Sequence, residues 1–318
     1  MHRPVITDSM TMTNTASAEQ LNKDFAFNTG NNSLSIISGP AGISQIEIQN
    51  RQATARISLQ GAHILSWKPK NQTDVIWLSQ EANFAAGKSV RGGIPICWPW
   101  FGAHQTNQAY PAHGFARTVL WQLTKTSAVS DDETEISLKL VTSQLDASYQ
   151  AMWPQATTAE YIISIGKKLG LRLITHNHSD QAISIGQALH SYFNVDDISN
   201  TAVLGLENKD YLDKTLDFKR NTQHGPVLIE AEVDRIYLQT TEALVIDNKK
   251  RKLSITKQGS ATTVVWNPGK EVAEKMGDLG DNGYQKMLCV ESANAAEDCR
   301  QIAAAESHEL SVLYELEN

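Results

Sequence analysis

The stretch Ala53-Thr-Ala-Arg-Ile-Ser-Leu59 alternates apolar and polar side chains, residue by residue. Alternation with a period of two is typical of a β-strand that buries one face and exposes the other. Short runs with the same alternation, or with β-branched residues, recur along the chain. They cover residues 33–37, 46–48, 75–78, 135–141, 161–165, 169–175, 182–185, 253–256, 262–266, 287–291 and 310–316. We therefore expect a protein built almost entirely of strands.

Turn-forming residues separate these runs, and helical periodicity is scarce. Only residues 270–279 could form a short helix. Strands that follow one another through short turns pair antiparallel, and they bury their apolar faces when two sheets stack. We predict a single all-β domain over residues 33–318, a large antiparallel β-sandwich. Residues 1–32 are polar and without a clear period, and we expect them to form a flexible leader.

The composition excludes several classes of protein. The 318 residues carry 28 Lys and Arg against 35 Asp and Glu, a net charge of −7 without a basic block, so no nucleic-acid partner is expected. No run approaches the ~18 consecutive apolar residues of a membrane helix, and no secretory signal is visible. Three cysteines without a C-x-x-C pair favour the reducing cytoplasm over a disulfide framework. No glycine-rich phosphate loop occurs, and we expect neither a cofactor nor a metal.

The first candidate site is the segment Val90-Arg-Gly-Gly-Ile-Pro-Ile-Cys-Trp-Pro-Trp-Phe-Gly102. Its glycines allow a ligand to approach the backbone, and its prolines stiffen the loop. Trp98, Trp100 and Phe101 could form an apolar platform for a sugar ring. Arg91 offers a planar fork suited to a phosphate or to vicinal hydroxyls. The alternative is a buried aromatic corner with Arg91 in a salt bridge.

Three further segments place polar side chains among apolar ones. His113 and Arg117 lie close together beside a glycine, a pattern that loops also use for structural hydrogen bonds. Strand alternation puts His190 and Tyr192 on one face, and a histidine there is either a satisfied core residue or an acid/base group. Glu291 ends an apolar strand, where desolvation would raise its basicity unless it is capped or salt-bridged.

Two remaining clusters are weaker signals. Asp234 could accept hydrogen bonds from sugar hydroxyls, or it could pair with the adjacent Arg235. His176 and His178 are two residues apart, but no third ligand stands at a convincing spacing, so we interpret them as solvated strand-end residues.

Together these segments resemble the aldose 1-epimerase (galactose mutarotase-like) superfamily, and most closely its glucose-6-phosphate 1-epimerase branch. The motifs that carry the resemblance occur in the family's order and span residues 35–317. They are Arg91-Gly-Gly-Ile-Pro95 with Trp98-Pro-Trp-Phe-Gly102, His113-Gly-Phe-Ala-Arg117, Leu189-His-Ser-Tyr-Phe193, Asp234-Arg-Ile-Tyr237 and Val290-Glu-Ser-Ala-Asn294. One departure is Ala112, where some relatives have Gln before the His-Gly pair.

The resemblance implies a β-supersandwich that requires no cofactor. It implies that His190 is the catalytic acid and Glu291 the catalytic base. It also implies a substrate site lined by the other four candidates, Arg91, His113, Arg117 and Asp234. The expected reaction interconverts the α and β anomers of a hexose 6-phosphate, with glucose 6-phosphate as the first candidate, in a cytoplasmic monomer whose partner is this small molecule.

In this interpretation, Glu291 stabilises the His190 imidazolium and so keeps an acid available near neutral pH. Arg91 and Arg117 would select phosphorylated sugars. Two alternatives stay open at this point. One is a carbohydrate-binding or sugar-sensing protein without catalysis on the same fold. The other is a glycoside hydrolase or lyase, in which Asp234 would supply the second carboxylate.

Overall fold

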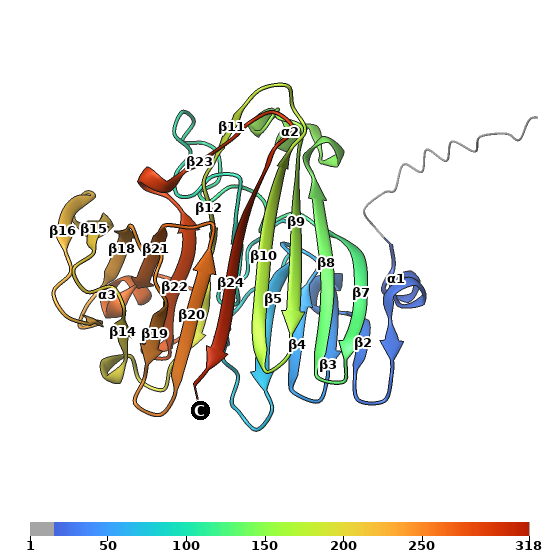
Figure 1. Cartoon of the computed structure of the whole chain (residues 1–318), viewed down its shortest axis with the longest axis horizontal. Coiled ribbons are helices and arrows are strands. Elements are labelled where there is room, and N and C mark those ends of the chain that lie inside the picture. The colour runs from blue at the N-terminus through green and yellow to red at the C-terminus, as the bar shows by residue number, and fades with distance from the viewer. Residues whose placement is uncertain (1–15, 318) are drawn as a thin grey trace, which may run out of the picture.

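The computed structural model describes residues 16–317, whose strands form three large sheets and one two-stranded pair (Figure 1). All pairings between the named strands are antiparallel. The predicted antiparallel all-β fold is therefore confirmed. The α-helices of the described residues are α1 (Ala18–Phe25), α2 (Ala147–Met152) and α3 (Gly269–Ala273), and the other helical segments are short 3₁₀ turns. None of these helices is long and apolar enough to cross a membrane.

The three large sheets are described by their strand order. The five-stranded sheet runs β1 (Phe27–Asn28), β2 (Ser33–Ser38), β3 (Ser44–Gln49), β4 (Ala53–Ser58), β5 (His63–Pro69). The nine-stranded sheet runs β17 (Val227–Leu228), β14 (Ala202–Leu204), β19 (Leu244–Asp247), β20 (Lys252–Gln258), β24 (Ser307–Leu316), β10 (Lys168–Asn177), β9 (Thr157–Ile165), β8 (Glu133–Val141), β7 (Gln122–Ser130). The eight-stranded sheet runs β16 (Lys219–Thr222), β15 (Asp210–Asp213), β18 (Val233–Leu238), β21 (Thr262–Asn267), β22 (Met287–Asn294), β12 (Gln187–Leu189), β6 (Ile96–Cys97), with β13 (Tyr192–Asn194) also on β22. The separate pair is β11 (Ile183–Ile185) with β23 (Arg300–Ile302).

The nine-stranded sheet buries one face against both other sheets. On β10 and β24, buried residues alternate with more exposed ones, as expected for a sheet with one covered face. Trp67 on β5 donates to the Gly166 carbonyl of the β9–β10 turn at 3.2 Å. Ser191 of the eight-stranded layer lies 2.6 Å from the Tyr314 hydroxyl on β24. The core therefore lies between the nine-stranded sheet and the other two, and the second face of the eight-stranded sheet is left for a site.

Residues 16–32 belong to the predicted flexible leader, but they carry a helix and a strand that pack on the fold, so the expectation is wrong for this part. Helix α1 is capped by the Ser17 hydroxyl, and its Leu21 joins the core. The Asn22 side chain donates to the Ile36 carbonyl (2.6 Å) and accepts from the Ile36 N–H (2.8 Å). Since β1 pairs with only the first two residues of β2, Asn22 satisfies backbone groups that this edge would otherwise leave open. Residues 1–15 of the predicted leader lie outside the described residues, and the single domain stays a prediction.

Two other expectations need correction. Residues 75–78 do not form a strand, because their backbone bonds go to two different segments. The N–H of Val75 donates to the Trp67 carbonyl, whereas the N–H of Trp77 donates to the Tyr192 carbonyl. Only isolated bridges result. The expected helix over 270–279 is shorter, since α3 ends at Ala273 and the chain continues in turns toward Gly277.

Candidate active site

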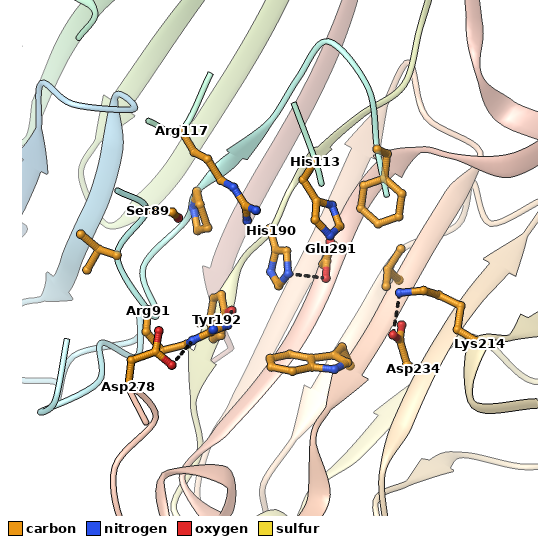
Figure 2. A pocket seen from close by; sticks show the side chains of 15 residues that line it. Ser89, Arg91, His113, Arg117, His190, Tyr192, Lys214, Asp234, Asp278 and Glu291 are labelled. Atoms are coloured by element: carbon orange, nitrogen blue, oxygen red, sulfur yellow. Dashed lines mark hydrogen bonds and ion pairs between the residues drawn. The ribbon is translucent and has the colours of Figure 1, made fainter. Parts of the chain in front are cut away.

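A pocket of about 290 Å³ opens on the outer face of the eight-stranded sheet. It gathers all six candidate residues, although they span two hundred positions of sequence (Figure 2). Its lining consists of Ser89, Val90, Arg91, Pro95, Phe101, His113, Arg117, His190, Tyr192, Lys214, Asp234, Val264, Trp266, Asp278 and Glu291. The antiparallel pairing of short strands and their loops therefore produces one polar cluster from five separate motifs.

His190 and Glu291 form the centre of this pocket. The register pairs Leu189 with Ser292 and Tyr192 with Cys289, so His190 stands opposite Glu291 across the gap between β12 and β13. The His190 Nε2 lies 3.3 Å from the Glu291 Oε1. The side chain of Glu291 is 1% exposed and that of His190 is 12% exposed. Such a pair can exchange a proton directly and can present both atoms to a ligand.

Burial acts on the two groups in opposite directions. It raises the pKa of Glu291 well above its ordinary range, and the nearby Asp234 adds to this. Burial lowers the pKa of His190 well below its ordinary range, and the positive charges of Arg117 and Arg91 act in the same sense. Both shifts favour the uncharged form of each group, which differs from the expected stabilisation of the His190 imidazolium by Glu291. Among residues 16–317, the Nδ1 of His190 and the Oε2 of Glu291 have no hydrogen-bond partner.

The His113-Gly114 pair is a backbone feature with a chemical consequence. His113 has a φ of 66°, and a Cβ at Gly114 would come within 2.0 Å of the Trp98 carbonyl oxygen, so only glycine fits there. The Gly102 N–H donates to the His113 Nδ1 at 3.3 Å. Burial lowers the pKa of His113 to about 3, and the neutral ring therefore carries its proton on Nε2. Figure 2 shows this ring pointing toward Glu291.

Two arginines line the wall of the pocket on the His190 side. Arg91 pairs through its Nε with Asp278 at 3.0 Å, and its Nη1 donates to the Tyr192 hydroxyl at 3.1 Å. The salt bridge considered for Arg91 is thus present, and Arg91 still faces the pocket. Arg117 donates to the Ala112 carbonyl at 3.0 Å, and no carboxylate lies within ion-pair distance of it in the part of the chain that the structure describes. This wall carries more positive than negative charge.

The opposite wall is an ion pair that sequence reasoning missed. The Lys214 Nζ lies 2.5 Å from the Asp234 Oδ2, and both side chains are partly buried. Asp234 does not pair with Arg235, because neighbouring residues of β18 point to opposite faces. Arg235 instead contacts Asp213 at 3.4 Å and lies over the Tyr211 ring. The Lys214–Asp234 pair supplies donors and an acceptor suited to hydroxyl groups.

Comparison with known proteins identifies the family. Residues 44–315 match the family model described as aldose 1-epimerase. The chain belongs to the aldose 1-epimerase family. It is 36% identical over 255 residues to an Escherichia coli protein named "Putative glucose-6-phosphate 1-epimerase", with 79% of this chain and 83% of that protein covered. A crystal structure of a "putative mutarotase" from Salmonella typhimurium matches with a TM-score of 0.82 at 32% identity, over 91% of this chain and 95% of that one.

More distant structures agree on the fold. A galactose mutarotase-like protein from Clostridium acetobutylicum gives a TM-score of 0.71 at 13% identity, over 90% of this chain and 98% of that chain. The expected galactose mutarotase-like sandwich is thereby confirmed. The family model and the relatives above 30% identity confirm the expected class of enzyme, an isomerase acting on anomers.

The aromatic platform of this epimerase differs from the expected one. Trp98 is fully buried and donates to the Thr175 hydroxyl at 3.0 Å, while Trp100 is buried and donates to the Pro111 carbonyl. Both lie in the core, so their assignment to the pocket is wrong. Phe101 does line the pocket. Trp266 takes the second aromatic position, and its pairing with Asp234 in the β18–β21 register was the signal that could have revealed it. Lys214 opens a short 3₁₀ helix and Asp278 lies in a turn, and neither gave such a signal.

Metal-ligand types meet at one place among the described residues. The ligand atoms of His190, Cys289 and Glu291 lie within 4.8 Å of one another. Burial raises the pKa of the Cys289 thiol well above its ordinary range, so it stays protonated and is a poor ligand. His176 on β10 contacts Glu160, and His178 just after β10 contacts Thr158, without a third ligand in the described structure.

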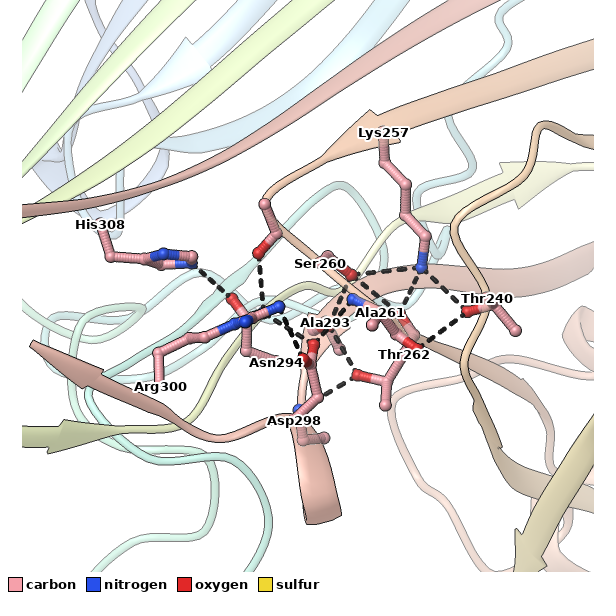
Figure 3. A network of polar contacts seen from close by, with 12 residues as sticks. Thr240, Lys257, Ser260, Ala261, Thr262, Ala293, Asn294, Asp298, Arg300 and His308 are labelled. Atoms are coloured by element: carbon pink, nitrogen blue, oxygen red, sulfur yellow. Dashed lines mark hydrogen bonds and ion pairs between the residues drawn. The ribbon is translucent and has the colours of Figure 1, made fainter.

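A buried polar network fixes the end of β22 beyond Glu291 (Figure 3). The hydroxyls of Ser260 and Thr262 both donate to the Ala293 carbonyl at 2.6 Å. The Asn294 side chain donates to Asp298 at 2.8 Å and contacts the His308 ring at 3.1 Å. Because these bonds lie two and three residues after Glu291 on the same strand, they hold its carboxylate in place opposite His190.

Proposed function

We propose that this epimerase interconverts the α and β anomers of a hexose 6-phosphate, with glucose 6-phosphate as the preferred substrate. The observation that carries the proposal is the His190–Glu291 pair at 3.3 Å, beside a wall that holds Arg91 and Arg117. The names of the relatives at 31–36% identity support the same substrate.

The chemistry needs one base and one acid at adjacent oxygens. Ionised Glu291 removes the proton of the C1 hydroxyl, and protonated His190 gives its proton to the ring oxygen. The C1–O5 bond breaks, its electron pair stays on O5, and the C1–O1 bond becomes a carbonyl. Rotation about C1–C2 and the reverse transfers close the ring with C1 inverted. Each proton transfer of this type contributes roughly 10²- to 10⁴-fold to the rate.

The pocket orients the sugar in one way. O1 and O5 are bonded to the same carbon, so they can meet the Glu291 Oε1 and the His190 Nε2, which are themselves neighbours. C6 carries the phosphate and is bonded to C5, which is itself bonded to O5. The phosphate therefore lies on the His190 side of the sugar, where Arg91 and Arg117 lie. The remaining hydroxyls face the Lys214–Asp234 pair on the other wall, and the Trp266 ring provides an apolar surface.

His113 completes the set of polar contacts. Its Nε2–H points into the pocket and can donate to a sugar oxygen near Glu291. Some relatives have Gln at the position of Ala112, so this chain lacks a side-chain amide there. The backbone carbonyl of Ala112 instead accepts a hydrogen bond from Arg117. We therefore assign the binding of substrate to His113, Arg117, Arg91 and Asp234, with catalysis at His190 and Glu291.

The test is a direct measurement of anomerisation. Freshly dissolved α-glucose 6-phosphate and α-glucose are followed by polarimetry or NMR, with and without enzyme. We expect a large acceleration for the phosphate ester and a smaller one for the free sugar. An unchanged spontaneous rate would indicate a protein that only binds sugars, and release of reducing sugar from a glycoside would indicate a hydrolase.

The cellular setting is part of the proposal. We propose a cytoplasmic monomer, because all three cysteines are free thiols and the large apolar side chains exposed in the described residues are few: Val129, Leu216, Phe218 and Leu228. Sedimentation of the purified protein tests the oligomeric state.

A further inference from the structure

The orientation of the His190 ring is not set by hydrogen bonds at both of its nitrogens. A histidine that exchanges protons is usually aligned by a hydrogen bond to its second ring nitrogen. The Nδ1 of His190 is buried and has no hydrogen-bond partner among residues 16–317. The Nε2 contacts Glu291 at 3.3 Å, and this one contact leaves the plane of the ring free to turn. Packing against other side chains must therefore fix this plane.

The ring of Tyr192 lies flat against the His190 imidazole. The two ring centroids are 4.9 Å apart, and the ring planes differ by 10°. Tyr192 is itself held in place, because it is buried and its ring also stacks on Trp77 at 5.9 Å. Trp266 meets the imidazole with its edge at 6.0 Å, so it restricts the ring without lying parallel to it. The stack with Tyr192 therefore fixes the plane of the imidazole and keeps its Nε2 directed at Glu291.

The hydroxyl of Tyr192 reaches the wall that carries the arginines (Figure 2). It accepts a hydrogen bond from the Arg91 Nη1 at 3.1 Å, and Asp278 accepts one from the Arg91 Nε at 3.0 Å. Two of the three guanidinium nitrogens are thus held by residues of the described structure, and Nη2 is left for a ligand. Because a binding group that is fixed in advance loses less freedom when the ligand arrives, the phenol contributes to the phosphate side of the pocket.

We propose that Tyr192 is a positioning residue: its ring aligns His190 for proton transfer, and its hydroxyl aligns Arg91 for the phosphate of the substrate. This role rests on the proposed function. Tyr192 acts through these two residues, with a different part of one side chain for each. The ring should therefore affect kcat, because the orientation of the acid matters in the chemical step. The hydroxyl should affect KM, because Arg91 holds the phosphate before and during that step.

Two substitutions separate the hydroxyl from the ring. Tyr192→Phe keeps the ring and removes the hydroxyl. We expect KM for glucose 6-phosphate and the inhibition constant of inorganic phosphate to rise roughly 3- to 10-fold, the size of one hydrogen bond, while kcat stays within about threefold of the wild type. Tyr192→Leu removes the ring as well. Its kcat should fall roughly 100-fold, because a small misplacement of a reacting group has an effect of that order.

Tyr161→Leu is the matched control for lost packing. Tyr161 is a fully buried tyrosine on β9 whose ring meets Trp121 at 6.4 Å, and it lies outside the pocket lining. All variants are assayed below their Tm. We expect Tyr161→Leu to lower the Tm but to retain kcat. If either leucine variant does not fold, the methionine variant at the same position takes its place, because an unbranched side chain adapts to the space.

Three outcomes would overturn the positioning role. In the first, Tyr192→Leu keeps kcat within about threefold of the wild type, or Tyr161→Leu loses as much kcat as Tyr192→Leu does. In the second, Tyr192→Phe loses as much kcat as Tyr192→Leu, so that ring and hydroxyl have no separate roles. In the third, Tyr192→Phe leaves both KM and the inhibition by phosphate unchanged, so that the hydroxyl does not act through Arg91. The proposed function fails differently, since it is refuted when the wild-type protein does not accelerate anomerisation of glucose 6-phosphate.

Discussion

Replacing Glu291 by Gln is the sharpest single perturbation of the proposed mechanism. Gln keeps the size and shape of the side chain but cannot take a proton from the C1 hydroxyl. Since general base catalysis contributes roughly 10²- to 10⁴-fold, we expect kcat for glucose 6-phosphate to fall by that factor, or about 3–5 kcal/mol of activation free energy. The 3.3 Å contact with His190 can survive as a hydrogen bond to the amide.

The same substitution should leave the fold intact. Burial raises the pKa of the Glu291 carboxyl and so favours its neutral form, and its Oε2 has no hydrogen-bond partner among the described residues. A neutral amide therefore introduces no new buried charge. We expect the Tm of Glu291→Gln to stay within a few degrees of the wild type, as measured by calorimetry.

The assay needs a matched control. Glu160 faces His176 at 3.6 Å on β9 and β10, far from the pocket lining, and forms a second His–Glu pair in the same protein. Glu160→Gln should retain full activity in anomer-exchange NMR of glucose 6-phosphate. The reasoning fails if Glu291→Gln stays within tenfold of the wild type, or if Glu160→Gln loses as much activity as Glu291→Gln.

Three other perturbations test the two walls and the buried network. Arg117→Met should lower kcat/KM for glucose 6-phosphate roughly 10- to 100-fold more than for glucose, because hydrogen bonds to charged groups contribute about 1.5–3 kcal/mol; equal losses on both sugars would refute the phosphate role. Lys214→Met should lower kcat/KM for both sugars alike by roughly 10-fold or more, since it leaves Asp234 unpaired. Lys209→Met, at a surface pair with Glu242, is the matched control. Burial lowers the pKa of Lys257 to about 7, so between pH 7 and the ordinary lysine pKa the unfolded chain binds a proton that the folded chain has released. The free energy of unfolding should therefore rise with pH in this window, by up to about 1 kcal/mol per pH unit. Urea denaturation should show a smaller rise for Lys257→Met than for the wild type. Equal slopes of unfolding free energy against pH in the two proteins would contradict this.

Local patterns were sufficient for much of the fold. The alternation of Ala53–Leu59 predicted a strand, and β4 covers Ala53–Ser58, because a period of two places one set of side chains in the core whatever the partner strand is. Residues 75–78 have similar β-branched content but no ladder, since strand identity also needs continuous hydrogen bonding to one neighbour. The N-terminal helix was missed because its role is to cover the β2 edge with Asn22, a contact that no local pattern reports.

The candidate residues were recognisable as sequence motifs, whereas their partners were not. The family resemblance pointed to His190 and Glu291, and strand pairing brings them to 3.3 Å. Lys214 and Asp278 are ordinary surface-type residues in the sequence, and only the folded chain turns them toward Asp234 and Arg91. Trp98 was expected in the aromatic platform, yet packing places it in the core and places Trp266 in the pocket.

The sequence by itself determined that this is an antiparallel all-β protein with the motifs of an aldose 1-epimerase, because strand periodicity and motif order are local properties of the chain. The tertiary structure decided the environment of His190 and Glu291. It buries both side chains 3.3 Å apart and surrounds them with the charges of Arg117, Arg91, Asp234 and Lys214. These residues come from distant segments and act through space, so no local pattern could reveal that burial disfavours the imidazolium expected from the sequence.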